Sequence, residues 1–193
     1  RIISWSMAFT APAPEPANRI PANKMNTSLN SNSIAFIGLC NEFCIAVENA
    51  RESQRDEFLD TMLHLLPRIY IAATDLRTVS LSFDDTYIER VLEEDYYESV
   101  RRSMEGLFGE YDVYLEVFEE DMKYSDTPVA ASISEGLADI FQVLYDFINS
   151  IREATDEKVN GALAVMADDF RNYWSAPLCN VLRALNYLKM NMQ

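Results

Sequence analysis

The chain has 193 residues, of which 31 are acidic and 16 are basic, so its formal net charge at pH 7 is −15. Nucleic acids and anionic membrane surfaces bind proteins through basic faces, so this charge argues against both as partners and favours a basic protein. Hydrophobic residues make up 49% of the sequence, while glycine and proline number only 5 and 7, which predicts a folded, helical chain.

The first 24 residues show no periodic pattern and contain four of the prolines. We expect residues 1–24 to be a non-native or disordered leader, with Met25 as the natural start. A secretory signal is the alternative, because residues 2–13 form an apolar run that ends in small residues. Its basic region consists of Arg1 alone and the run is short and interrupted, which argues against a signal.

Two helices are predicted in the first half of the domain, over residues 34–51 and 54–76, because apolar residues recur there at helical spacing. Pro67 lacks a backbone donor, so we expect it to bend or end the second helix. Residues 77–90 have no helical period and are expected to form a connector. A third helix is predicted over residues 91–108, with Gly109 as its stop.

Residues 110–118 alternate between apolar and polar side chains, as a strand does. A single strand in a helical domain would have no partner, so we expect an ordered connector here. A fourth helix is predicted over residues 132–151, begun either by Thr127 or by Ser132 in a capping box. Its apolar face should be buried, and its polar residues should face solvent: Glu135, Asp139, Gln142, Asp146 and Asn149.

The last two helices are predicted over residues 156–173 and 176–190, with Ser175 as a cap. Pro177 lies close behind Ser175, so this junction is either a kink or a break. The expected fold is therefore one all-α domain, a bundle of five or six helices over residues 32–190.

Carboxylates at 135 and 139 share a helical face and suggest a metal site as an alternative to a solvated surface. The all-helical nucleotide pyrophosphatases hold magnesium with E-x-x-E on one helix and E-x-x-D on the next. Glu116 and Glu119 match the first motif, but Asp139 is one residue out of place after Glu135, a rotation of about 100°. A metal-dependent enzyme of this type remains the alternative function; we expect no metal and no cofactor.

The single histidine, His64, is too few for a di-iron bundle, which needs two Glu-x-x-His motifs. Cys40, Cys44 and Cys179 would complete a Cys₃His zinc set with it, but no C-x-x-C spacing is present. We expect these cysteines to be small apolar residues. Their odd, low number suits a reducing compartment and predicts a cytoplasmic protein.

Residues 84–126 concentrate the charge, with 15 acidic and 4 basic residues, and they hold six of the 10 tyrosines. Tyrosine is enriched at protein interfaces, so this stretch is a candidate docking surface for a basic partner. The alternative is that the tyrosines cover the core and the acids keep the domain in solution.

Three stretches, DVYLEVF (112–118), LADIFQVL (137–144) and FRNYWSAPLCNVLRAL (170–185), resemble a bacterial family of small all-helical proteins with a domain of unknown function. The positions that match its motifs are Tyr114, Phe118, Asp139, Trp174 and Arg183. The resemblance implies the fold and a bacterial cytoplasmic setting, and no activity. Family members carry His-Trp-Gly where this chain has Tyr-Trp-Ser at 173–175, so a role for that histidine does not carry over.

We expect the domain to be a non-enzymatic interaction or regulatory module. A bridge between Asp139 and Arg183 would join two helices if both side chains point the same way. The candidate interaction residues are Tyr96, Tyr97, Tyr111, Tyr114, Asp139, Trp174 and Arg183.

Overall fold

The computed structural model describes residues 29–76, 87–116, 123–124 and 127–191. The predicted leader and most of the 77–90 connector lie outside these residues. Six α-helices occupy the described part of the chain, so the all-α fold is confirmed. They are α1 (Ser31–Glu48), α2 (Arg55–Thr74), α3 (Glu94–Phe108), α4 (Ile133–Ile151), α5 (Asp156–Asp169) and α6 (Ser175–Asn191).

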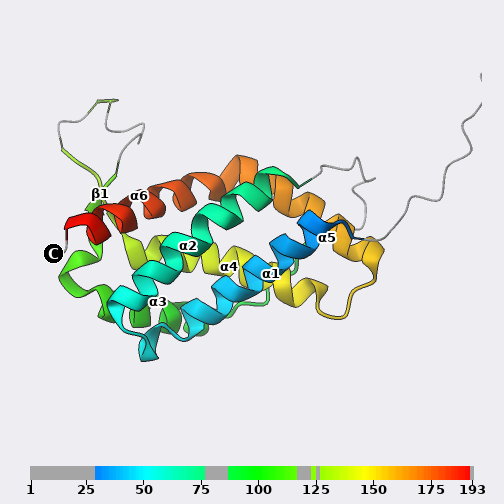
Figure 1. Cartoon of the computed structure of the whole chain (residues 1–193), viewed down its shortest axis with the longest axis horizontal. Helices are drawn as coiled ribbons and strands as arrows, with labels where there is room; N and C mark the ends of the chain where they lie inside the picture. The colour runs from blue at the N-terminus through cyan, green and yellow to red at the C-terminus, as the bar shows by residue number, and fades with distance from the viewer. Residues whose placement is uncertain (1–28, 77–86, 117–122, 125–126, 192–193) are drawn as a thin grey trace, which may run out of the picture.

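Helix α4 forms the centre of the bundle, in contact with α1, α3, α5 and α6, while α2 packs on both α1 and α6 (Figure 1). Its predicted apolar face is confirmed, because Leu137, Ile140, Phe141 and Leu144 are all fully buried. Helices α4 and α6 approach so closely that a Cβ added to Gly136 would collide with the side chain of Val181. None of the helices in the described residues is long and apolar enough to cross a bilayer.

Pro67 was expected either to bend or to end the second helix. It does not end the helix, because α2 continues to Thr74. The missing backbone donor removes one hydrogen bond from the helix. Leu66 and Ile69, on either side of the proline, are completely buried. Burial of such side chains offsets the local cost of proline, so tertiary packing decides the length of this helix.

The prediction that residues 110–118 have no strand partner is wrong. Strand β1 (Val113–Leu115) pairs antiparallel with β2 (Ala130–Ser132), and Tyr114 lies opposite Ala131. Helix α4 follows β2 directly, and Ser132 is its N-cap, with its hydroxyl accepting the amide N–H of Glu135 at 3.2 Å. Of the two predicted starts, the one at Ser132 is therefore correct.

The prediction that Asp146 faces solvent is also wrong, because this side chain is 5% exposed. Its Oδ1 accepts the backbone N–H groups of Val91 and Leu92, each at 2.9 Å. These two residues lie just before α3, so Asp146 fixes the entry of the chain into that helix. A helical wheel of α4 alone cannot show a segment that packs on its polar side.

The junction of α5 and α6 is continuous. A π-helical turn, Phe170–Trp174, joins the two helices, and Ser175 is the first residue of α6 rather than its cap. The ring of Trp174 packs edge-on against Phe170, with ring centroids 4.6 Å apart. Phe170 and Trp174, at the two ends of the turn, are buried, and the helical path from α5 to α6 is unbroken.

Candidate interaction surface

The short hairpin is held to the bundle by Asp112, a residue the sequence did not single out. Its carboxylate accepts three hydrogen bonds: from the Ser132 hydroxyl at 2.6 Å, from the Ser134 hydroxyl at 2.7 Å and from the Ser134 N–H at 2.8 Å. Asp112 is 5% exposed and Ser134 is fully buried. A buried carboxylate therefore joins the start of β1 to the first turn of α4, where the helix dipole favours negative charge.

A hollow of about 390 Å³ lies between β1 and α6, and we call it the β1–α6 hollow. Apolar and aromatic side chains are unusually exposed around it: Val113 is 65% exposed, Leu115 57% and Tyr187 68%. The lining is completed by Glu110, Tyr111, Tyr114, Ile133, Arg183, Ala184 and Leu188. Strand alternation explains the exposure, because residues 113 and 115 share one face of a sheet that no other described element covers.

Three of the predicted interaction residues meet in this hollow: Tyr111, Tyr114 and Arg183. The guanidinium of Arg183 donates from Nη2 to the carbonyl oxygen of Leu115 at 2.7 Å and lies 5.9 Å from the centre of the Tyr114 ring. The guanidinium of Arg55 lies 4.9 Å from the centre of the Tyr111 ring. Both tyrosines are thus held in place from one side, which reduces the entropy that they would lose on binding a partner.

The suggested bridge between Asp139 and Arg183 is not formed. Asp139 accepts the hydroxyl proton of Tyr97 at 2.7 Å, whereas Arg183 bonds to β1. Burial, and secondly the hydrogen bond to Asp139, raise the pKa of Tyr97, so this tyrosine is neutral at physiological pH. Asp139 therefore connects α4 to α3, not to α6.

Tyr96 lies away from the hollow, on the side of α3 that faces α1 and α4. Its hydroxyl donates to Glu48 at 2.7 Å, and its ring packs edge-on against Phe141 and Tyr145. The side chain is 38% exposed. Burial, followed by the hydrogen bond to Glu48, raises its pKa. Tyr96 therefore combines both interpretations of the tyrosines: its ring covers the core while one side faces solvent.

Trp174 belongs to the core, because it is only 3% exposed. Its indole Nε1 has no hydrogen-bond acceptor among the described residues. Of the predicted interaction residues, it is the one that is not accessible at the surface of this structure. Its match to the family motif is explained by packing against Phe170 in the π-helical turn.

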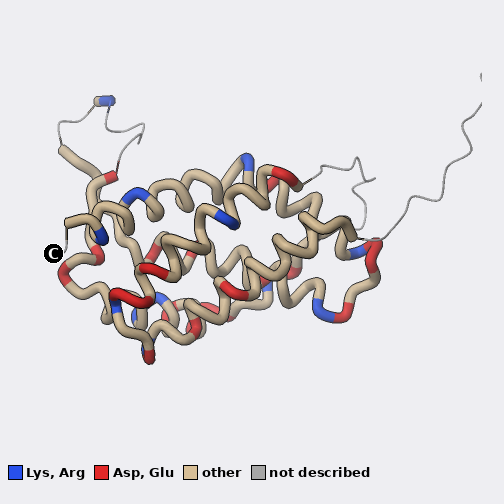
Figure 2. The backbone as a smooth tube through the Cα atoms, viewed as in Figure 1, with Lys and Arg blue, Asp and Glu red and all other residues tan. Residues whose placement is uncertain are grey.

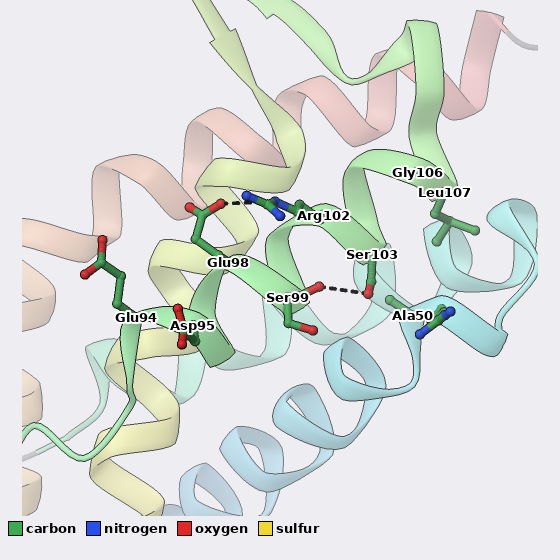
Figure 3. A pocket seen from close by; sticks show the side chains of 10 residues that line it. Ala50, Glu94, Asp95, Glu98, Ser99, Arg102, Ser103, Gly106 and Leu107 are labelled. Carbon is green, nitrogen blue, oxygen red and sulfur yellow. Dashed lines mark hydrogen bonds and ion pairs between the residues drawn. The ribbon is translucent and has the colours of Figure 1, made fainter.

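A second hollow, an open groove of about 790 Å³, runs along α3 beside the turn at Ala50 and Arg51 (Figure 3). Glu94, Asp95 and Glu98 line it on the α3 side. Glu98 pairs with Arg101 at 3.1 Å and with Arg102 at 3.5 Å, and the hydrogen bond from Arg101 lowers the pKa of Glu98. Arg51 and Arg102 also line the groove, so its three acidic side chains are largely balanced and the surface is only mildly acidic.

The suggested metal-binding sets are not brought together. Glu116 follows β1, where its N–H donates to the carbonyl of Val129, so it does not lie on a helix as the pyrophosphatase design requires. Glu119 lies outside the described residues. In the part of the chain that the structure describes, no three His, Cys, Asp or Glu side chains are grouped so that they would hold a metal ion.

The cysteine set is likewise spread over the molecule. Cys40 and Cys44 are buried in α1, and burial raises the pKa of the Cys44 thiol to about 12. Cys179 is exposed on α6. His64 is exposed on α2, where its Nδ1 lies 2.7 Å from the carbonyl oxygen of Asp60. The prediction that the cysteines are small apolar core residues is therefore confirmed for Cys40 and Cys44 and is wrong for Cys179.

Comparison with known proteins agrees with the resemblance seen in the sequence. The crystal structure of protein BF1032 from Bacteroides fragilis is similar, with 31% sequence identity and a TM-score of 0.71 over 83% of this chain and 93% of that one. No curated protein matches the chain. The family described as Domain of unknown function (DUF5063) matches residues 27–191, which is most of the sequence. The chain therefore belongs to the DUF5063 family.

Proposed function

We propose that this domain is a non-enzymatic protein-interaction module that binds a basic partner at the β1–α6 hollow. The observation that carries the proposal is the exposure of Val113, Leu115 and Tyr187 around one indentation. Monomeric proteins rarely expose a large contiguous apolar patch. Such a patch with a polar rim is typical of a protein-binding site.

The hollow offers a rigid binding surface. Asp112 anchors β1 to α4 through three hydrogen bonds, and Arg183 holds the far end of the strand through the Leu115 carbonyl. A partner that docks here would order few side chains, so little of the binding free energy would be lost to entropy. Tyr111 and Tyr187 would supply amphipathic contact area with few rotatable bonds.

The charge of the chain supports a basic partner. Figure 2 shows acidic residues over much of the bundle, and the total is −15. Glu110 lies at the hollow itself, and Glu94 and Asp95 line the groove on α3. Such a field speeds the encounter with a basic surface, and salt weakens it because the Debye length falls to about 3 Å at 1 M.

The same proposal includes a cytoplasmic setting. Cys40, Cys44 and Cys179 are all free thiols in this structure. Free cysteines are typical of proteins in a reducing compartment, whereas secreted domains of this size more often pair them.

Affinity purification from the native host, followed by mass spectrometry, tests the proposal. The chain should recover a basic protein, and recovery should fall at high salt. The double variant Tyr111→Ala/Tyr187→Ala should lose that protein, because it removes two rings that line the hollow. The matched control is Tyr173→Ala, which removes a tyrosine that is 71% exposed and lies on the π-helical turn, outside the hollow.

Circular dichroism melts of both variants establish that they remain folded. Equal recovery of the same partner by the wild-type chain and the folded double variant would show that the hollow is not the docking site. Loss of the partner from the control as well would point to a different face.

A further inference from the structure

Helix α1 presents to solvent a stripe of low charge that carries two large apolar side chains. Its exposed positions follow one face of the helix and include these two side chains, Ile34, 58% exposed, and Ile45, 48% exposed. The stripe consists of Ser31, Ile34, Gly38, Asn41, Ile45 and Glu48. The helix carries only two charged residues, Glu42 and Glu48, and Figure 2 shows it almost free of charge. Helices that are apolar on all sides are normally buried on all sides.

Gly38 lies in the middle of this stripe. A Cβ added there would have no described heavy atom within 4 Å, so no contact with the rest of the domain requires a glycine. A glycine inside a helix makes the helix less stable than an alanine would, by roughly 0.5–1 kcal/mol. A residue without a side chain at an exposed helical position allows the backbone of another helix to come close.

A shallow groove of about 520 Å³ runs beside the stripe, between α1 and α2. Ile45, Ala46 and Leu65 form its apolar part. Acidic residues at its edges are matched by basic ones: Glu42 lies 3.9 Å from Arg68, and Asp60 lies 2.7 Å from Lys189. Apart from Glu48 at the end of the stripe, this face is therefore close to neutral, although the whole chain carries −15.

The stripe is complementary to itself when it runs in the opposite direction. Ile34 and Ile45 lie at equal distances along the sequence on either side of the midpoint between Leu39 and Cys40. Gly38 and Asn41 also lie at equal distances on either side of that midpoint. Two antiparallel copies centred on this midpoint would place Ile34 against Ile45 of the partner subunit. They would also place Gly38 against Asn41 of the partner subunit, so the small residue accommodates the larger one.

We propose that this face is a homodimer interface, in which α1 packs antiparallel on α1 of a second copy about a two-fold axis. A two-fold contact uses the same patch twice and therefore requires this self-complementarity. Charge supports a second copy as the occupant, because two chains at −15 repel each other and this repulsion is weakest where faces of low charge meet. The side chain of Ile34 from each copy would enter the groove beside Ile45 of the other.

Sedimentation velocity over a range of protein concentrations measures the interface, and it is independent of any partner at the β1–α6 hollow. We expect the wild-type chain to dimerise reversibly. Ile34→Lys and Ile45→Glu should each weaken dimerisation by about a hundredfold, the scale expected when a charge replaces a central apolar contact. The double variant Ile34→Lys/Ile45→Glu should recover much of the affinity, because each lysine then faces a glutamate of the other copy.

Two further variants distinguish loss of the dimer from loss of folding. Gly38→Leu should leave the melting temperature unchanged or higher, because the site is open, and should abolish the dimer. Tyr173→Glu adds a charge at a residue that is 71% exposed on the π-helical turn and should leave the dimer intact. A chain that stays monomeric at all concentrations would overturn the proposal. The proposal would also be overturned if neither Ile34→Lys nor Ile45→Glu weakened the dimer, or if the double variant Ile34→Lys/Ile45→Glu failed to restore it.

Discussion

Replacing Asp112 with alanine tests how the hairpin is held to the bundle. The carboxylate accepts three hydrogen bonds at 2.6–2.8 Å, two of them from the fully buried Ser134. Hydrogen bonds to a charged acceptor contribute about 1.5–3 kcal/mol each, and their effects within one network are not additive. Removing the acceptor also leaves the Ser134 N–H without its partner. We therefore expect Asp112→Ala to lower the free energy of unfolding by about 3–5 kcal/mol.

Urea denaturation followed by circular dichroism measures this change. Asp112→Asn should cost less than Asp112→Ala, because the amide keeps one oxygen as an acceptor. The matched control is Glu110→Ala, an exposed acidic residue two positions earlier, which should change stability by only about 0.5 kcal/mol. If Asp112→Ala cost no more than this control, the network would not hold β1 in place, and the case for a rigid hollow would fail.

Three other changes test the packing and the charges of the bundle. Leu144→Ala should cost about 2–5 kcal/mol in denaturant melts, because Leu144 is completely buried; a cost below about 1 kcal/mol would contradict its place in the core. Asp146→Ala should cost about 2–4 kcal/mol, since two backbone N–H groups lose their acceptor, and hydrogen exchange should accelerate at those two amides; unchanged exchange would refute the contact. Burial, and then the neighbouring Asp168, raise the pKa of Asp169 above its ordinary 3.8, so the folded state binds this proton more tightly than the unfolded chain. Ionisation at neutral pH therefore opposes folding: Asp169→Asn should raise the melting temperature at pH 7, and the gain should shrink as the pH falls toward 3.8, whereas a gain independent of pH would exclude this cause.

Helical periodicity was sufficient to predict most of the fold. The spacing of apolar residues in α4 predicted which side is buried, and Leu137, Phe141 and Leu144 are all inside. Gly109 ends α3 as predicted, and its φ of 58° is a conformation that glycine adopts without strain. These features depend on residues that are close together in the chain, so the spacing of residue types along the sequence is enough to predict them.

Contacts between distant segments could not be predicted in this way. Strand β2 has three residues, Ala130–Ser132, and is too short to show alternation, so the partner of β1 was missed. Asp146 was assigned to solvent because its partners are backbone N–H groups of another segment, which no side-chain pattern reveals.

The candidate site was predicted only in part. Tyr111, Tyr114 and Arg183 do lie together, but the expected partner of Arg183 was Asp139 rather than the Leu115 carbonyl, 68 positions away in the chain. Tyr187 was not singled out, because a tyrosine on the solvent side of an amphipathic helix carries no signal of its own. Its significance follows from the position of α6 beside β1.

Amide hydrogen exchange of the chain, alone and with the basic partner that affinity purification recovers, tests the proposed docking site most directly. The proposal predicts that binding slows exchange in residues 110–116, which include β1, and in the part of α6 that lines the hollow, around Arg183 and Tyr187. Exchange in α5, which lines no part of the hollow, should be unchanged. Protection confined to α5 or to another face, with the hollow unaffected, would contradict the proposal.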